Sequence, residues 1–428
     1  MKKSYNPISD VRNESADLTK RLYRSISDAA HELDESRRGA RSVSDLFAPR
    51  VAYQRARLRD ACERLLMDGG GGEVTPTAHA QMRKTEELLW RKVYYDVVAA
   101  AKRIRQGSTT NDSWQMEEML LVHNHITAGV GLYHHLLWRL QCEHSHLDMN
   151  GITDSLVFFP DRGLKKATGR SGGHSASNGI DKLKDEARKG GGGGGGEEWA
   201  QQLAHRCLIY LGDLCRYLVD LQPGWDYGLA THYYTQALLL KPEAGLPHNQ
   251  LGTMAGAQNY CLDAVYHYMR CLSCAQTFEG AEGNLNQLLD KHSWNQLSAG
   301  VSCALARTVA RLLSCARTWY CNRPPPPHPP MHKLCDDLIV DLRECLHAVE
   351  DADPVAEPDD IELFAMVRRV NERPTRMTEE MLFKSVAIVL MCLHNLNKRG
   401  SSELSRGVSL QVSMMAQVLN QIMLKVES

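Results

Sequence analysis

The sequence lacks an excess of charge of either sign. Its 428 residues contain 50 Lys and Arg against 51 Asp and Glu, a formal net charge of -1 at pH 7. Proteins that bind DNA or RNA through the phosphate backbone use clustered cations, because each neutralised phosphate releases counterions. The chain as a whole has no such excess of positive charge. This argues against a dedicated nucleic-acid-binding protein, although a local basic patch is still compatible with the composition.

Long hydrophobic segments and a secretion signal are also missing. The longest apolar run, Val386–Leu393, falls far short of the roughly 20 residues that a membrane-spanning helix needs. The start, Met1–Pro7, has no apolar core of a signal peptide. The 13 cysteines are scattered, mostly over apolar helical positions, which is unlike the disulfide framework of a small secreted domain. We expect a soluble protein with reduced thiols in the cytoplasm, with shuttling to the nucleus as an addition.

The chain lacks the motifs of the common catalytic and metal sites. It has no G-x-S-x-G, no HExxH and no defensible pair of carboxylates, and its glycine runs lack the Lys-Ser/Thr of a phosphate loop. Histidines gather at 123–125, 134–135 and 144–146, but their spacing matches no zinc pattern. We therefore expect a non-enzymatic protein with no catalytic residues, no metal and no cofactor.

What the sequence has instead is helical periodicity. Apolar residues recur every three to four positions along most of the chain, and no segment reads convincingly as a strand. The pattern predicts an all-α protein. The expected helices outside the central hairpins cover about 16–33, 51–67, 80–105, 113–142, 279–294, 297–321, 331–349, 379–398 and 402–425.

Two helical hairpins of one type are predicted within Glu198–Leu289. Each opens on Leu-Gly, at 211–212 and at 251–252, and its second helix carries an alanine, an aromatic four residues later and a small residue seven residues later. These second-helix residues are Ala230, Tyr234 and Ala237 in one hairpin and Ala264, Tyr268 and Cys271 in the other. The spacing is the tetratricopeptide signature. Small residues let two helices approach, the aromatic fills the wedge between them, and the hairpins present surfaces for partners.

Two segments interrupt the helical pattern. Residues from about 161 to 196 are rich in Gly, Ser and Lys and end in seven glycines, a composition that predicts a disordered insertion. The run at 324–330 predicts an extended proline-rich spacer, with a ligand for proline-binding domains as the alternative. We expect one helical domain over 15–295 and a C-terminal helical extension over 296–428.

Basic residues lie on two predicted helices, away from their apolar stripes. Arg91, Tyr95, Val98 and Lys102 fall on one face of the helix over 80–105. Arg216 lies two residues after the apolar Leu214, about 200° round its helix. Solvated faces commonly have this appearance, and that interpretation stands beside a functional one.

The segments around these basic residues resemble a known family. Gly212–Leu218 resembles the Gly-Asp-x-x-Arg-Tyr-Leu helix of 14-3-3 proteins, and Val93–Lys102 resembles their earlier basic helix. More closely, the chain is similar to the SMG-five/six/seven family of adaptors in nonsense-mediated mRNA decay, and within it to the SMG-five branch. The similarity covers nearly the whole chain outside the glycine-rich and proline-rich segments. Its main matches are Lys20–Arg24, Glu86–Tyr95, Cys207–Leu214, Asn249–Thr253, Phe278–Leu285 and Leu390–His394.

The resemblance implies a 14-3-3-like helical domain followed by a helical-hairpin extension. It also implies an adaptor role with two protein partners, an SMG-seven-type adaptor in a heterodimer and the phosphorylated RNA helicase of the decay pathway. A protein phosphatase is a further candidate partner. The SMG-five type normally continues into a nuclease-like PIN domain that nothing in these 428 residues matches, so we expect a truncated or partial form of that type.

The resemblance also places a phosphopeptide pocket. The family's phosphate-binding and peptide-binding positions map onto Arg216, Tyr217, Lys102 and Asn249. Tyr95 stands where the 14-3-3 and SMG-seven types carry a lysine. A phosphoserine carries nearly two negative charges, so losing a cation weakens its capture. The resemblance therefore implies a weakened pocket, for which Arg91, one turn earlier, compensates in part.

Two other functions fit the sequence less well. A telomerase-associated accessory factor that binds nucleic acid is the main alternative, because relatives in this superfamily serve telomeres. A tetratricopeptide co-chaperone would need more repeats and a cluster of cations to hold a carboxylate terminus.

Overall fold

The computed structural model of the chain describes residues 7–68, 76–107, 114–144, 147, 194–222, 226–292, 303–326, 328–347 and 377–427. By its internal contacts the chain divides into two compact units, Met1–Trp225 and Asp226–Ser428. The named elements within the described ranges are all helical, and one isolated bridge joins Ala244 and Gln276. The prediction of an all-α protein is confirmed. No helix in these ranges is long and apolar enough to cross a membrane.

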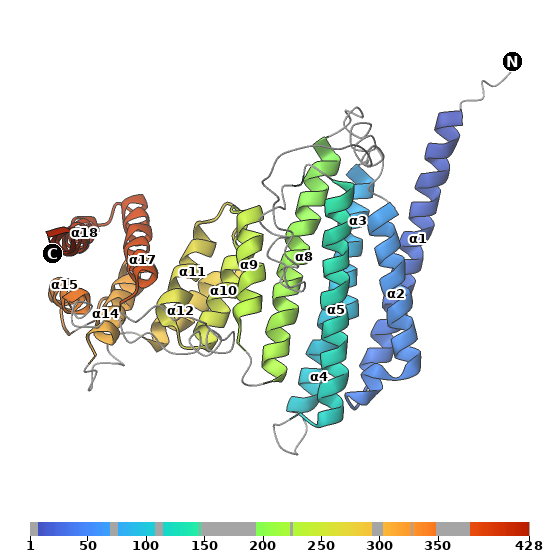
Figure 1. Cartoon of the computed structure of the whole chain (residues 1–428), viewed down its shortest axis with the longest axis horizontal. Coiled ribbons are helices and arrows are strands. Elements are labelled where there is room, and N and C mark those ends of the chain that lie inside the picture. Colours follow the sequence, from blue (N-terminus) through green and yellow to red (C-terminus); the bar gives the residue numbers. More distant parts are fainter. Residues whose placement is uncertain are drawn as a thin grey trace, which may run out of the picture. The chain divides into compact units, whose positions relative to one another are not determined.

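The first unit consists mainly of long helices that run side by side (Figure 1). α1 packs against α2, and α5 packs against α8. Large apolar side chains such as Ile26, Leu58, Ile126 and Leu203 fill the space between the helices. The elements are α1 (Pro7–Arg38), a 3-10 turn (Ser44–Phe47), α2 (Pro49–Asp68), α3 (Pro76–Leu88), a π-turn (Leu89–Tyr95), α4 (Asp96–Gln106), α5 (Met116–Glu143) and α8 (Gly194–Leu221).

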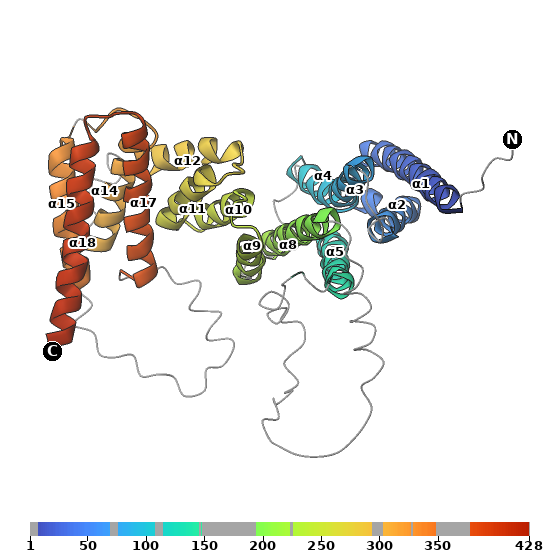
Figure 2. The same cartoon turned by 90° about the horizontal axis from the view of Figure 1, so that it is seen from above.

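The second unit begins with short helices and ends in a bundle of longer ones. Figure 2 shows α14, α15, α17 and α18 side by side. α14 and α18 each pack against both α15 and α17, which closes the bundle. The helices are α9 (Gly228–Leu240), α10 (Leu246–Ala257), α11 (Cys261–Ser273), α12 (Gly280–Lys291), α14 (Ala304–Trp319), α15 (Met331–His347), α17 (Glu379–Lys398) and α18 (Leu404–Glu427).

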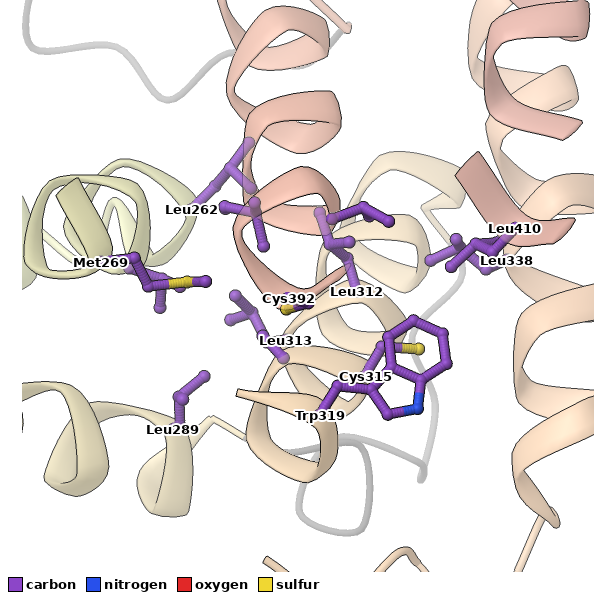
Figure 3. Packing of buried hydrophobic residues seen from close by; sticks show 14 of the residues in the cluster. Leu262, Met269, Leu289, Leu312, Leu313, Cys315, Trp319, Leu338, Cys392 and Leu410 are labelled. Atoms are coloured by element: carbon purple, nitrogen blue, oxygen red, sulfur yellow. The ribbon is translucent and has the colours of Figure 1, made fainter. Parts of the chain in front are cut away.

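One continuous apolar core joins α11 and α12 to this bundle. It runs from Leu262 on α11 to Met414 on α18, and Figure 3 shows Leu313, Trp319 and Cys392 at its centre. The core therefore crosses residue 295, where the sequence suggests a domain boundary. The division between the compact units falls at residue 225 instead. The domain limits 15–295 and 296–428 do not follow these units and stay a prediction.

The second tetratricopeptide-type hairpin is formed by α10 and α11. Gly252 lies so close to Tyr268 that a Cβ at Gly252 would approach two ring carbons to 2.9 Å. Asn259 makes the turn with φ at 61°, and the amide of Tyr260 donates to the carbonyl of Ala255 at 2.8 Å, which closes the end of α10. The small-residue and aromatic pattern is confirmed here. The two helices of the first expected hairpin, α8 and α9, belong to different units, so that hairpin stays a prediction.

The two expected interruptions are only partly within the described residues. Helix α8 begins at Gly194, inside the glycine run, so the expected loop over 161–196 is wrong in its last three residues. The remainder, 161–193, lies outside the described residues. The proline-rich spacer separates α14 from α15 as expected, and Arg317 Nη1 donates to the carbonyl of Pro324 at 3.2 Å.

Candidate functional site

A π-turn interrupts the helical run that carries the first candidate residues. Leu89–Tyr95 forms this turn between α3 and α4, and π-turns are rare and often found at functional sites. The wider turn shifts the register of the residues that follow. As a result Val98 is 2% exposed, and the expectation that it shares an exposed face with Arg91 and Lys102 is wrong.

A buried ion pair lies where the π-turn segment meets α8. Glu86 on α3 is 2% exposed, pairs with Arg206 and accepts a hydrogen bond from the hydroxyl of Tyr210. Burial raises the pKa of Glu86, although both partners act in the opposite direction. Trp90 stacks on Tyr210 with ring centroids 4.3 Å apart and an interplanar angle of 9°. These contacts hold the π-turn against α8.

The apolar and basic patterns of the sequence do not predict this ion pair. Glu86 lies three residues before Leu89, on the apolar stripe of its helix. A charged residue at a core position was the signal that could have found it, because buried charges are paired as a rule. Its partner on α8 could not have been named from the sequence.

Three of the predicted site residues meet between α4 and α8. Tyr217 is 7% exposed, and its ring centroid lies 4.7 Å from Cζ of Arg216 and 5.0 Å from Nζ of Lys102. Both distances are within the roughly 6 Å reach of a cation–π attraction. Burial raises the pKa of Tyr217, and the nearby Asp213 and Tyr95 add to the rise. The neutral ring is thus a fixed platform for two cations.

Each of these cations has a carboxylate partner within the chain. Nζ of Lys102 lies 2.6 Å from Oδ2 of Asp220, and Nη2 of Arg216 lies 3.0 Å from Oδ1 of Asp213. Neither aspartate has a role predicted from the sequence. Asp213 lies three residues before Arg216, a spacing at which helical side chains meet. Lys102 and Asp220 are 118 positions apart, so no local sequence pattern predicts their contact.

The other two predicted residues of this unit lie at the surface. Tyr95 is 43% exposed, and its ring centroid lies 6.4 Å from that of Trp90. Arg91 is exposed and forms no ion pair with a described residue. Arg91 therefore differs from Lys102 and Arg216, whose charges are already compensated.

Asn249 belongs to the second unit, where it lies on α10. It is 4% exposed, and its Oδ1 accepts a hydrogen bond from Nδ2 of Asn284 at 3.1 Å. Next to it, the Nδ1 atoms of His248 and His267 lie 3.0 Å apart. Burial lowers the pKa of both histidines, to about 4 for His248. The role of Asn249 in holding a peptide backbone stays a prediction.

The histidines of α5 are used in packing and in a surface contact. Nε2 of His135 lies 3.5 Å from a carboxylate oxygen of Glu63. His125 is half-buried beside Arg55, and desolvation lowers its pKa to about 3. Among the residues that the structure describes, no group of three or more His, Cys, Asp or Glu could hold a metal ion.

Two family models match the chain in succession. Residues 84–222 match the model described as telomerase activating protein Est1, and residues 230–427 match the Est1 DNA/RNA binding domain. Human nonsense-mediated mRNA decay factor SMG5 is 29% identical over 432 residues, which cover 96% of this chain and 38% of the human protein. Along nearly its whole length the chain is thus similar to the SMG5 branch of the Est1-like proteins.

More distant members of the family match shorter parts or the fold alone. SMG7 of Arabidopsis thaliana is 39% identical over 97 residues, which cover 22% of this chain and 9% of that protein. The crystal structure of Est1 and Cdc13 matches with a TM-score of 0.51 and 11% identity, over 94% of this chain and 70% of that one. This likeness shows a shared helical fold. The chain spans less than two fifths of the length of the SMG5 relatives from human, mouse and zebrafish.

Proposed function

We propose that the chain is a non-enzymatic adaptor of nonsense-mediated mRNA decay that works by binding other proteins. The observation that carries the proposal is the match to SMG5 along 96% of the chain. The site supports it, because cations held around a buried tyrosine ring are suited to recognising an anionic group. We place this role in the cytoplasm, with shuttling to the nucleus.

The first proposed partner is an SMG7-type adaptor, in a heterodimer. Helix α5 offers a surface for it, since Leu120, Thr127, Gly131 and Trp138 recur at seven, four and seven residues and share one face. This face is roughly 27 Å long at 1.5 Å per residue. Leu120 is 48% exposed and Trp138 is 60% exposed, and no atom lies within 4 Å of a Cβ built at Gly131. Tryptophan is typical of interface hot spots, and a glycine between the two anchors lets another helix approach closely.

Sedimentation velocity of the chain mixed with a purified SMG7-type adaptor tests the heterodimer. We expect one co-sedimenting species at micromolar concentration, and its loss in Trp138→Glu and in Gly131→Arg. Gly283→Arg on α12 is the matched control, because Gly283 is also an exposed helical glycine with open space around its Cβ. Two independent species with the unsubstituted chain would contradict the heterodimer. Equal loss in the control would contradict the surface on α5.

The second proposed partner is the phosphorylated RNA helicase of the decay pathway, bound through Arg216, Lys102 and Tyr217. A charge-assisted hydrogen bond contributes about 1.5–3 kcal/mol, and each 1.4 kcal/mol is about tenfold in affinity. With Tyr95 in place of a lysine, we propose weak binding to which Arg216 contributes most. A protein phosphatase stays a proposal that rests on the resemblance alone.

Anisotropy titrations with phosphorylated and unphosphorylated serine peptides test this pocket. We expect Tyr95→Lys to tighten binding of the phosphopeptide by about tenfold, and Arg216→Glu to abolish binding in both backgrounds. Tyr53→Lys on α2 is the control, since it adds the same charge at another exposed tyrosine, 71% accessible. If Tyr95→Lys brings no gain while the fold stays intact, the assignment of the pocket to these helices is wrong.

Binding of single-stranded nucleic acid is the second candidate function, because residues 230–427 match a model described as DNA/RNA binding. The charge distribution of that unit is unfavourable for binding nucleic acid. Arg307, Arg311 and Arg317 are each paired with a carboxylate at 3.0 Å or less, and α18 has no charged residue from 407 to 424. A binding constant that falls steeply with salt would favour this candidate. We expect no measurable binding of single-stranded RNA or DNA at 0.15 M salt.

A further inference from the structure

We propose that Asp220 acts as an internal competitor for the cations of the candidate pocket and makes the pocket selective for a dianion. The inference rests on the proposed phosphopeptide function. It assigns to Asp220 a role in specificity, as a side chain that the ligand must displace.

The two carboxylates of the pocket differ in how firmly they are held. Asp213 has a side chain that is 9% exposed and accepts from Arg216 within one helix. Asp220 is 30% exposed, and its partner Lys102 on α4 is 33% exposed. A rotation of the Asp220 side chain returns its carboxylate to water. The carboxylate of Asp213, in contrast, would lose its partner at a position with little access to solvent. Asp220 is therefore the exchangeable partner.

The charges of the cluster cancel in the free protein. Lys102 and Arg216 supply two positive charges, and Asp213 and Asp220 supply two negative ones. A ligand with one negative charge that replaces Asp220 beside Lys102 only substitutes one single charge for another, so the exchange contributes little to its binding free energy. A phosphoserine carries about 1.5 to 2 negative charges and three acceptor oxygens at pH 7, so it gains from the exchange.

The ring of Tyr217 keeps the cations available once Asp220 has left. Nζ of Lys102 and Cζ of Arg216 both lie within 5.0 Å of its centroid, and the buried ring does not move with Asp220. While Asp220 is bound to Lys102, the phosphate cannot bind there. The apparent affinity is therefore the intrinsic affinity multiplied by the fraction of molecules in which Lys102 is free. For a partly exposed ion pair this reduction is about fivefold at most.

The test is Asp220→Asn, which keeps the size of the side chain and removes its charge. In anisotropy titrations we expect the phosphoserine peptide to bind about two- to fivefold more tightly. We also expect Asp220→Asn to bind the same peptide with glutamate in place of phosphoserine, and we expect no such binding by the unsubstituted chain. Asp60→Asn is the matched control, because Asp60 also forms an exposed ion pair, 2.9 Å from Arg59, on a different helix.

Three results would overturn the inference. An unchanged affinity in Asp220→Asn, together with the expected gain in Tyr95→Lys, would refute the competitor and leave the pocket in place. A lower melting temperature with unchanged affinity would show that the pair only clamps α4 to α8. If neither variant nor the unsubstituted chain binds the phosphopeptide, the pocket itself is refuted and this inference with it.

Discussion

The interiors of the two units each contain an ion pair, but they differ in what surrounds it. The middle of the first unit holds an ion pair, Glu86 with Arg206, beside the stacked rings of Trp90 and Tyr210. In the second unit Arg311 pairs with the buried Asp341 between α14 and α15, beside a continuous set of mainly aliphatic, cysteine and methionine side chains around Trp319. Hydrogen bonds, ion pairs and ring stacking depend on the relative orientation of the groups, whereas aliphatic packing depends mainly on the volume of the side chains.

This difference explains why the candidate pocket lies on the first unit. A pocket for a small anionic group needs side chains with fixed orientation, and the contacts of Glu86 and Trp90 orient the π-turn that ends at Tyr95. In the second unit the pair of Arg311 with Asp341 links α14 to α15, and the apolar core holds the helices of the bundle together.

The largest expected effect is that of Trp319→Ala. Trp319 is 1% exposed in the core of the second unit, and truncating a buried tryptophan typically costs about 3–5 kcal/mol. Urea denaturation followed by circular dichroism measures the change. Trp319→Phe, which keeps most of the volume, should cost less. A loss below about 1 kcal/mol for the alanine variant would show that this core is not the main support of the unit.

A somewhat smaller effect is expected for Glu86→Ala in the first unit. The substitution leaves Arg206, which is 23% exposed, without its carboxylate and removes the acceptor of Tyr210. We expect a loss of about 3 kcal/mol, at the lower end for a broken buried pair because Arg206 reaches solvent. Glu86→Gln keeps an acceptor and should cost roughly half as much. Equal stability of all three proteins in urea would refute a structural role for the pair.

Acid should destabilise both units through histidines whose pKa is lowered in the folded protein. The folded pKa of His248 is about 4 and that of His125 about 3, both below the unfolded value of about 6.5. The unfolded chain therefore binds more protons below pH 6.5, and stability falls as the pH drops from there toward pH 4. We expect a loss of roughly 1–3 kcal/mol for each histidine. The urea midpoints at pH 7.5, 6 and 5 measure this loss. His125→Asn or His248→Asn should reduce the dependence of stability on pH in its own unit.

The smallest effect compares two matched glycines. Gly131 on α5 and Gly283 on α12 are exposed, and neither has an atom within 4 Å of an added Cβ. Replacing glycine by alanine in a helix stabilises by about 0.5–1 kcal/mol. We expect this gain from Gly131→Ala and from Gly283→Ala alike. A loss at either position would show that the local packing is tighter than the open space around its Cβ indicates.

The sequence by itself determined the helices, the second hairpin and the family. Helical periodicity is a local property, so the expected helix over 379–398 agrees with α17 at both ends. The spacing of Gly252 and Tyr268 predicted their contact, because two neighbouring helices joined by a short turn have few ways to pack. The match to Lys102, Arg216 and Tyr217 named residues that do lie together.

The ion pairs and the geometry of the candidate pocket could be seen only in the folded chain. The π-turn at Leu89–Tyr95 changes which residues share a face, and periodicity at 3.6 residues per turn cannot express it. The pairing of Lys102 with Asp220 joins two helices that are distant in the sequence. Such contacts depend on how helices pack, and packing is set by the whole core of the unit at once. The carboxylates that compensate the cations of the pocket therefore became visible only in the folded chain.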